Sequence, residues 1–228
     1  AAGAEVAIDD VVADRAAQVV GEITEAGGRA IAAPFDVTDH DAVVAGVERL
    51  GGVDILVNNA GNAGTAGWAG LAKFVDTTPS DWDLYLKVNL YGVMHCVHAV
   101  LPSMIERNWG RIITIVSDAG RVGDSHMAAY CAAKAGAAGL TRGVALEVGR
   151  HGITVNNISL GTMKTPVSAA MWDDPDNPQA KQIMQRYVIR RPGEPDDVAG
   201  LALYLASPMA SWITGQTYPV NGGFSFAL

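Results

Sequence analysis

Residues 111–134 read RIITIVSDAGRVGDSHMAAYCAAK, an apolar run followed by a loop and an alanine-rich segment. The apolar run predicts a strand that is buried on both faces and ends at Ser117. The alanine-rich segment predicts a helix, which places Tyr130 and Lys134, four residues apart, on one face. A strand, a loop and a helix in this order form one unit of a parallel α/β sheet.

The same alternation of short β-branched runs and helical patterns continues along the chain in both directions. The other runs that predict strands are residues 5–8, 30–35, 53–57 and 153–158. No repeat or linker interrupts the alternation, so we predict one domain over residues 1–228, an α/β fold with a Rossmann-like, doubly wound parallel sheet. Such a sheet binds ligands at the carboxyl ends of its strands. The polar residues expected there, each of which alone is more typical of an ordinary turn or cap, are Asp10, Asp36, Asn58, Ser117 and Ser159.

The composition argues against several classes of function. A net charge of -8 without a basic run makes nucleic acid an unsuitable partner. The longest apolar stretches are too short or too interrupted to cross a bilayer, and no signal peptide precedes the first strand. Cys96 and Cys131 fit neither a disulfide framework nor a metal site, and the histidines lack metal-ligand spacing. We therefore expect a soluble, cytoplasmic protein that binds no metal, nucleic acid or membrane.

The juxtaposition of a phenol and an ammonium has a chemical meaning. A free tyrosine has a pKa near 10 and is a poor base at neutral pH. The ammonium of Lys134 would favour the phenolate of Tyr130 and lower that pKa. A phenol tuned in this way can exchange a proton with an alcohol or carbonyl oxygen, which Ser117 could also hydrogen-bond. The hydride would have to come from a cofactor, and a Rossmann-like sheet is a natural place to hold a nicotinamide.

With these residues the chain resembles a short-chain dehydrogenase/reductase of the single-domain branch. A Tyr-x-x-x-Lys motif alone is a weak signal, but five motifs in the family's order make a strong one. The match extends over essentially all 228 residues. The motifs are Tyr130 with Lys134, the upstream Ser117, Asn89 in KVNLYG, the Asn-Asn-Ala-Gly turn at 58–61, and Asp36 in DVTD.

The resemblance implies a role for each of these residues. Tyr130 would be the general acid/base, Lys134 would lower its pKa and bind the nicotinamide ribose, and Ser117 would orient the substrate oxygen. Asn89 would hold a water that connects Lys134 to solvent. In the segment LGTMKT at 160–165, leucine replaces the family's usual proline. The further cofactor contacts that the resemblance implies are Asp36, Val37, Asn58, Ala60, Gly61, Gly161, Met163 and Thr165.

The residues after the first run bear on the choice between NAD and NADP. An acidic residue at this position of a dinucleotide fold accepts hydrogen bonds from the ribose 2′-hydroxyl and repels a 2′-phosphate. Asp10 fits this position better than its neighbour Asp9, because it is the outward-reaching end residue. NAD is therefore favoured. Arg15, on the following helix, leaves NADP as the less favoured alternative.

One expected part of the fold has no counterpart in the sequence. A glycine-rich phosphate loop should lie about 20 residues before the acidic residue, which is before the first residue here. The first strand, the glycine-rich turn and the first helix are therefore missing, and we expect the domain to be N-terminally incomplete. The missing strand would lie between the strands at Val6 and Ile55 and would leave two open edges. The alternative is a fold that closes the gap without it.

The substrate and the assembly are less sharply defined. Residues 162–194 correspond in position to the family's substrate lid and are rich in apolar side chains. Arg186, Arg190 and Arg191 could meet an anionic group, although a solvated helix face is the more ordinary explanation. The stretch SDAGRVG is similar to members that act on cyclic or hydroxyacyl-CoA alcohols. We expect a homo-oligomer, a tetramer or dimer, formed through the helices around 84–104 and 130–148.

The leading hypothesis is therefore an oxidoreductase that transfers a hydride between NAD(H) and a hydrophobic secondary alcohol or its ketone. A second hypothesis is a non-catalytic nucleotide-binding or scaffold subunit of the same fold, or an inactive fragment of the enzyme. Such subunits typically lose the tyrosine or the lysine, and both are present here. A sugar-nucleotide epimerase or dehydratase would need a longer C-terminal substrate domain than this length allows.

Overall fold

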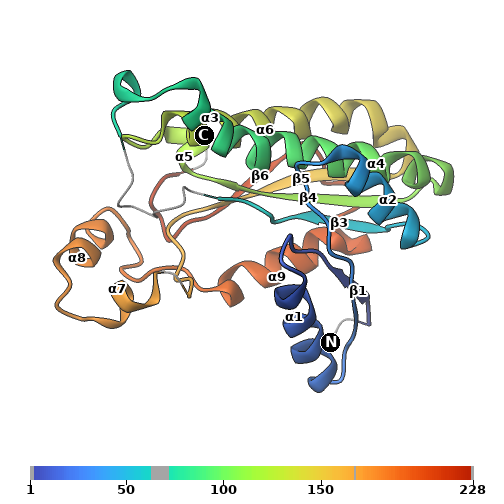
Figure 1. The fold of residues 1–228 in the computed structure, drawn as a ribbon, viewed down its shortest axis with the longest axis horizontal. Coiled ribbons are helices and arrows are strands. Elements are labelled where there is room, and N and C mark those ends of the chain that lie inside the picture. The colour runs from blue at the N-terminus through green and yellow to red at the C-terminus, as the bar shows by residue number, and fades with distance from the viewer. Residues whose placement is uncertain (1–2, 63–71, 167, 227–228) are drawn as a thin grey trace.

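The computed structural model describes residues 3–62, 72–166 and 168–226, and it shows parallel strands alternating with helices (Figure 1). The first half contains β1 (Glu5–Ile8), α1 (Ala13–Glu25), β2 (Arg29–Ala32), α2 (His40–Arg49), β3 (Ile55–Asn58), η2 (Phe74–Asp76), α3 (Pro79–Leu86), η3 (Lys87–Gly92) and α4 (Val93–Arg107). The second half contains β4 (Gly110–Ser117), α5 (Ala119–Val122), α6 (Ala128–Val148), η4 (Gly149–His151), β5 (Ile153–Leu160), α7 (Ala169–Asp173), α8 (Pro178–Met184), α9 (Pro195–Ala206), η5 (Pro208–Ala210) and β6 (Thr217–Val220). The predicted α/β class is confirmed.

The strands form two separate parallel sets. β3, β4, β5 and β6 pair in chain order, whereas β1 pairs with β2. Within the described residues β1 and β3 each have a strand partner on one side only. The sequence predicted a break between the strands at Val6 and Ile55, and the sheet is divided there. Val6 is 38% and Val57 is 45% exposed, so apolar side chains of both strands are open to solvent. That the domain is N-terminally incomplete stays a prediction.

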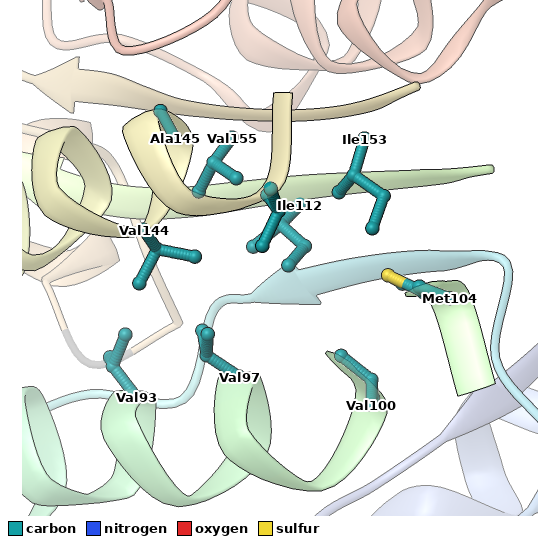
Figure 2. Packing of buried hydrophobic residues seen from close by; sticks show 10 residues of the cluster. Val93, Val97, Val100, Met104, Ile112, Val144, Ala145, Ile153 and Val155 are labelled. Carbon is teal, nitrogen blue, oxygen red and sulfur yellow. The ribbon is translucent and has the colours of Figure 1, made fainter. Parts of the chain in front are cut away.

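Helices cover both faces of the four-stranded sheet (Figure 1). On one face α4 and α6 pack on β4 and β5, and on the other α9 packs beneath the same strands. Figure 2 shows the first of these clusters, in which Val93, Val97, Val100 and Met104 of α4 point toward Ile112, Ile153 and Val155. The neighbours Ile112 and Ile113 belong to opposite clusters and are each 1% exposed. The strand is therefore buried on both faces, as its continuous apolar run predicted.

The second strand is shorter than the run at 30–35 predicted. β2 ends at Ala32. Pro34 has no N–H group to give to a neighbouring strand. The N–H of Phe35 donates to the Asp9 carboxylate at 2.9 Å instead of to a strand carbonyl. The carboxyl ends of β1 and β2 are therefore joined by a side chain where the ladder stops.

The long helical region that begins at Pro79 contains a π-helical turn. α3 continues into η3, residues Lys87–Gly92, which has π geometry before α4 resumes the α-helix. α4 ends at Asn108, whose φ of 51° closes the helix in the left-handed region near the predicted end. No pattern in the sequence predicted the π turn. Such turns are frequent at functional sites, and this one contains Asn89.

By length and hydropathy alone, the helix Pro79–Arg107 could cross a membrane, contrary to the expectation that no stretch could. Three helical segments, α3, η3 and α4, run on without interruption from Pro79 to Arg107, as the sequence pattern indicated. The α4 portion nevertheless packs Val93, Val97, Val100 and Met104 against the sheet. This burial is typical of the core helix of a globular domain.

The core predicts a clear stability effect. Ile158 in β5 is fully buried between β4 and α9, so Ile158→Ala should lower the free energy of unfolding by about 2–5 kcal/mol. Leu146→Ala is the matched control, because Leu146 is 89% exposed, and it should change stability by less than about 0.5 kcal/mol. Urea unfolding measures both. Equal effects of the two variants would contradict this packing.

Candidate active site

The carboxyl end of β4 carries the residues that the sequence selected for catalysis. β4 ends at Ser117, and α6, which carries Tyr130 and Lys134, packs against the same strand. β3 ends beside it at Asn58, whose Nδ2 donates to Thr114 Oγ1 at 3.2 Å. The parallel register therefore gathers these polar side chains at one edge of the sheet.

Tyr130 lies between Ser117 and an aromatic ring that the sequence did not select. The hydroxyl of Ser117 lies near enough to the phenol to oppose the rise in its pKa, and its Oγ accepts the N–H of Ala119 at 3.2 Å. The ring of Tyr85 meets that of Tyr130 edge-on, with centroids 6.1 Å apart. Tyr85 precedes Asn89 by four residues, and this helical spacing is the signal that could have linked it to the site.

Burial changes the acidity of both the phenol and the ammonium. Desolvation raises the pKa of Tyr130, and the hydroxyl of Ser117 opposes this only in part. Desolvation also lowers the pKa of Lys134 to about 8. Lys134 was expected to lower the phenol pKa, but here its Nζ donates to Ile115 O at 2.9 Å and lies 5.9 Å from the Tyr130 ring centroid. Burial therefore decides the direction, and the phenol holds its proton at neutral pH.

Asn89 is fully buried in the π turn and holds the loop that follows β3. Its Nδ2 donates to Asn62 O at 2.9 Å and to Tyr85 O at 3.0 Å, while its Oδ1 accepts the N–H of Asn62 at 3.2 Å. Gly61 lies so close that a Cβ there would be 2.9 Å from Asn89 Oδ1 and 3.3 Å from Lys134 Nζ. Asn89 therefore bonds to backbone, and its role in holding a water stays a prediction.

Close backbone contact between α5 and α6 positions the lysine. A Cβ at Gly120 would lie 2.8 Å from the N atom of Ala135 and 3.0 Å from the Cβ of Lys134. No side chain fits there, so the short helix after Ser117 packs directly on the turn that bears Lys134. Gly120 was missed at the sequence level, although it stands in the quoted stretch.

The two aspartates after β1 have separate tasks. Asp9 accepts the N–H of Phe35, and burial, with the nearby charges of Asp10 and Asp36, raises its pKa to about 6. Asp10 accepts only the N–H of Val12, two residues on, at 2.8 Å. Within the described residues this leaves its second carboxylate oxygen for a ligand, in line with the choice of Asp10 as the outward-reaching residue.

Asp36 and Val37 follow β2 and lie in an ordered turn. The carboxylate of Asp36 accepts the N–H and the hydroxyl of Thr38, each at 2.8 Å. The carbonyl of Val37 lies 2.9 Å from His95 Nδ1 on α4. A Cβ at Gly92 would come within 2.8 Å of the Val37 side chain, so the π turn and this segment pack tightly.

The three residues predicted beyond β5 are divided between two hollows. Gly161 and Met163 line a cavity of about 360 Å³, together with Tyr187 and residues 219–223. Thr165 instead lines a second hollow of about 430 Å³, and its N–H donates to Ser168 Oγ at 2.9 Å. Neither lining includes Ser117, Tyr130 or Lys134, so both hollows are distinct from the cluster of these three residues.

Asp118, which the sequence did not single out, has a heavily hydrogen-bonded carboxylate. It is 1% exposed and lies between Ser117 and α5. Four donors meet its carboxylate, from Arg121, Ser159, Asn221 and Ser225. A charged residue that directly follows a buried strand was the available signal. Ser159, expected at the strand ends, belongs to this network.

Neither metals nor disulfides enter the described site. Within residues 3–62, 72–166 and 168–226 no group of three metal-ligating side chains is present. Cys96 and Cys131 are both free thiols, and burial raises the pKa of Cys96 to about 12.

Comparison with known proteins identifies relatives along the whole chain. A family model described as enoyl-(acyl carrier protein) reductase matches residues 1–225. The chain is 37% identical over 227 residues to the (2S)-[(R)-hydroxy(phenyl)methyl]succinyl-CoA dehydrogenase subunit BbsD of Thauera aromatica, covering 98% of this chain and 87% of that protein.

Two solved structures show the same fold with different nucleotides. A 3-oxoacyl-[acyl-carrier protein] reductase from Brucella melitensis with bound NAD is 33% identical, with a TM-score of 0.86 over 99% of this chain and 83% of that one. A gluconate 5-dehydrogenase from Burkholderia cenocepacia in complex with NADP and tartrate is also 33% identical, with a TM-score of 0.86 over 97% of this chain and 86% of that one.

The raised pKa of Asp9 predicts a pH dependence of stability. The folded protein binds this proton more tightly than the unfolded chain, whose ordinary value is 3.8. The stabilisation is therefore complete below pH 3.8 and is lost as the pH rises through about 6. Asp9→Asn should be more stable than the parent at pH 7, on the order of 1 kcal/mol after solvent screening, and equally stable at pH 3.5.

Urea unfolding at the two pH values measures this difference. Asp14→Asn, at an exposed position of α1, is the matched control and should show no pH-dependent gain. A gain in stability for Asp9→Asn that is equal at both pH values would contradict the raised pKa of Asp9.

Proposed function

We propose that this chain, which belongs to the short-chain dehydrogenase/reductase family, interconverts a hydrophobic secondary alcohol and its ketone with NAD. As a member of this family it is an NAD(P)-dependent dehydrogenase that acts on CH–OH groups. One observation carries the proposal. The phenol of Tyr130, the hydroxyl of Ser117 and the ammonium of Lys134 gather at the carboxyl end of β4, and both titratable groups are buried.

The residues present fit the two ribose ends of a nicotinamide nucleotide. Lys134 Nζ has one protein acceptor within the described residues, so its other N–H groups can bind ribose hydroxyls. Asp10 has an oxygen left for the second ribose. The described residues around β1 hold no glycine-rich turn at a helix N-terminus, so they do not supply the pyrophosphate contacts of such a nucleotide. When bound, the nucleotide accepts or delivers the hydride.

The protein's own residues handle the proton. Tyr130 is protonated at neutral pH because burial raises its pKa, so it suits donation of a proton to a ketone oxygen. Ser117, at the end of β4 close to the phenol, would bind the same oxygen. In the opposite direction Tyr130 must first lose its proton, and alcohol oxidation should therefore increase with pH. Lys134 keeps a positive charge near the phenol below pH about 8.

The choice of NAD over NADP rests on Asp10. Its outward carboxylate supports hydrogen bonding to a 2′-hydroxyl and would repel a 2′-phosphate. Relatives with NAD and with NADP both exist, so the family alone does not decide. Arg15, the alternative considered for NADP, is exposed on α1.

For the substrate we propose a hydrophobic alcohol of the cyclic or acyl-thioester type. The relative BbsD is named for a succinyl-CoA substrate with a secondary alcohol, which supports this class. Of the three arginines considered for an anionic group, Arg191 is paired with Asp197 by two bonds of 2.7 Å. Arg186 lies 3.7 Å from Asp124. Arg190 is exposed and is the best placed to meet a charged part of the substrate.

A non-catalytic scaffold of the same fold is disfavoured because such subunits typically lose the tyrosine or the lysine, and Asn89, Ser117, Tyr130 and Lys134 are all present here. Homo-oligomer formation and cytoplasmic location stay predictions. The outward apolar residues Leu84, Tyr91 and Met94, which are 50%, 49% and 40% exposed, support an interface along α3 and α4.

The assignment of the acid/base makes a direct prediction. Tyr130→Phe should lower kcat/KM for ketone reduction by at least about 100-fold, because the proton donor is lost while the ring still fills its site. NADH oxidation with a panel of cyclic ketones and 3-ketoacyl thioesters measures it, and circular dichroism checks the fold. Tyr204→Phe, at a 39% exposed position of α9, is the matched control. Turnover that survives in Tyr130→Phe would defeat the assignment.

Cofactor choice can be tested separately. Asp10→Ser should reduce the preference for NAD over NADP by about tenfold or more, since it removes the negative charge that faces a 2′-phosphate. The ratio of kcat/KM for the two nucleotides reports this change. Asp14→Ser, on the exposed side of α1, should leave the ratio unchanged. An unchanged ratio in Asp10→Ser would mean that a residue other than Asp10 distinguishes the ribose 2′-hydroxyl from a 2′-phosphate.

A further inference from the structure

Asp118 is a buried carboxylate with a donor for each of its lone-pair positions. Arg121 Nη1 and Ser159 Oγ donate hydrogen bonds to Oδ1 at 3.0 and 2.6 Å. Asn221 Nδ2 and Ser225 Oγ donate hydrogen bonds to Oδ2 at 2.5 and 2.6 Å. One oxygen therefore bonds to α5 and β5, and the other bonds to the segment after β6.

These bonds fix the segment Asn221–Phe226 to the end of the catalytic strand. Asn221 Nδ2 also donates to Ser225 O at 2.8 Å, so the segment is closed into a turn around the carboxylate. Arg121 donates to Ser225 Oγ at 3.1 Å and to Phe226 O at 3.2 Å.

The fixed segment in turn supports the end of the lid region, residues 187–189. The N–H of Ile189 donates to Gly222 O at 2.8 Å. Gly222 and Gly223 have φ values of 58° and 78°, and a Cβ on Gly223 would lie 2.8 Å from Val188. The Phe224 ring packs against Tyr187, with centroids 5.1 Å apart.

The same contacts shape the cavity lined by Gly161 and Met163. Gly222, Gly223 and Tyr187 also line this 360 Å³ cavity. Arg186 lies over the Phe224 ring at 4.5 Å and 3.7 Å from Asp124, in the loop that leads to α6. The wall of this cavity thus depends on a carboxylate that lies next to Ser117 in the chain.

We propose that Asp118 is a positioning residue: its carboxylate holds residues 221–226 against β4 and β5, and through them the lid residues Tyr187 and Ile189, which line the 360 Å³ cavity. The inference rests on the proposed function for its consequence in catalysis, because it makes Asp118 a determinant of substrate binding. The tether itself is a property of the fold and can be measured without turnover.

Asp118→Asn is the sharpest variant. It keeps the shape of the side chain and replaces one acceptor oxygen by an amide N–H group. The serine hydroxyls can turn to accept from it, but Arg121 Nη1 and Asn221 Nδ2 can only donate. If the new amide N–H group takes the place of Oδ1 it faces Arg121 Nη1, and if it takes the place of Oδ2 it faces Asn221 Nδ2. In both orientations two donors face each other and one hydrogen bond is lost. Ser225→Ala is the milder second variant, because it removes one bond and leaves the pair of Asp118 and Arg121 intact.

The first readout is hydrogen exchange of the full chain. In both variants exchange of the Ile189 amide, which bonds to Gly222, should become faster, while the amides of β4 and β5 keep their protection. The second readout is steady-state kinetics, in which KM for the alcohol should rise by about 10- to 100-fold and kcat should change less. Asp54→Asn, at an exposed ion pair with Arg107 far from the site, is the matched control and should change neither.

Two results would overturn the proposal. If exchange becomes faster throughout β4 and β5 and Ile189 is not singled out, Asp118 only stabilises the fold. If KM is unchanged and kcat falls, Asp118 acts on Ser117 and not on the cavity wall. Should the parent protein turn over no alcohol or ketone, the proposed function fails, and the exchange of Ile189 still decides whether the tether exists.

Discussion

The site depends on the parallel pairing of β4 with β5. The two strands pair over eight residues, from Gly110 opposite Ile153 to Ser117 opposite Leu160, and nearly every residue along them is buried. A strand pair buried on both faces cannot shift its register without exposing an apolar face or a polar group. The residues at its carboxyl end, Ser117 among them, are therefore held at fixed positions, and α6, which carries Tyr130 and Lys134, packs against the same strands.

Burial at this end of the sheet has opposite consequences for its two ionic groups. The carboxylate of Asp118 meets four protein donors, so its charge is compensated within the fold. The ammonium of Lys134 has a single carbonyl acceptor within the described residues, and desolvation lowers its pKa to about 8. A buried charge that is saturated serves to hold structure. A buried charge that is left short of partners is suited to binding a ligand.

Much of the fold, and the gathering of Ser117, Tyr130 and Lys134 near the end of β4, could be predicted from the sequence, because both depend on local patterns. The continuous apolar run before Ser117 predicts a doubly covered strand, and helical spacing predicts that Tyr130 and Lys134 share a face. The division of the sheet beside Val6 followed from the absence of a glycine-rich turn. The direction of the Tyr130 pKa could not be predicted, because it depends on how much protein covers the phenol. Asp118 was missed for a similar reason, since its partners Asn221 and Ser225 are more than a hundred residues away.

The division of the sheet also separates the two ends of the proposed nucleotide site. Lys134 belongs to the four-stranded part, whereas Asp10 and Asp36 follow the two-stranded part. The two parts meet where Val37 packs against the π turn at Gly92 and its carbonyl faces His95. A π turn widens the helix by one residue, and here it brings Asn89 to the loop after β3 while its glycine admits Val37. One irregular turn thus supports both the loop beside Lys134 and the segment after Asp36. The distance between the two proposed ribose sites depends on this packing and on that of α2 against α4, because no strand within the described residues joins β1 to β3.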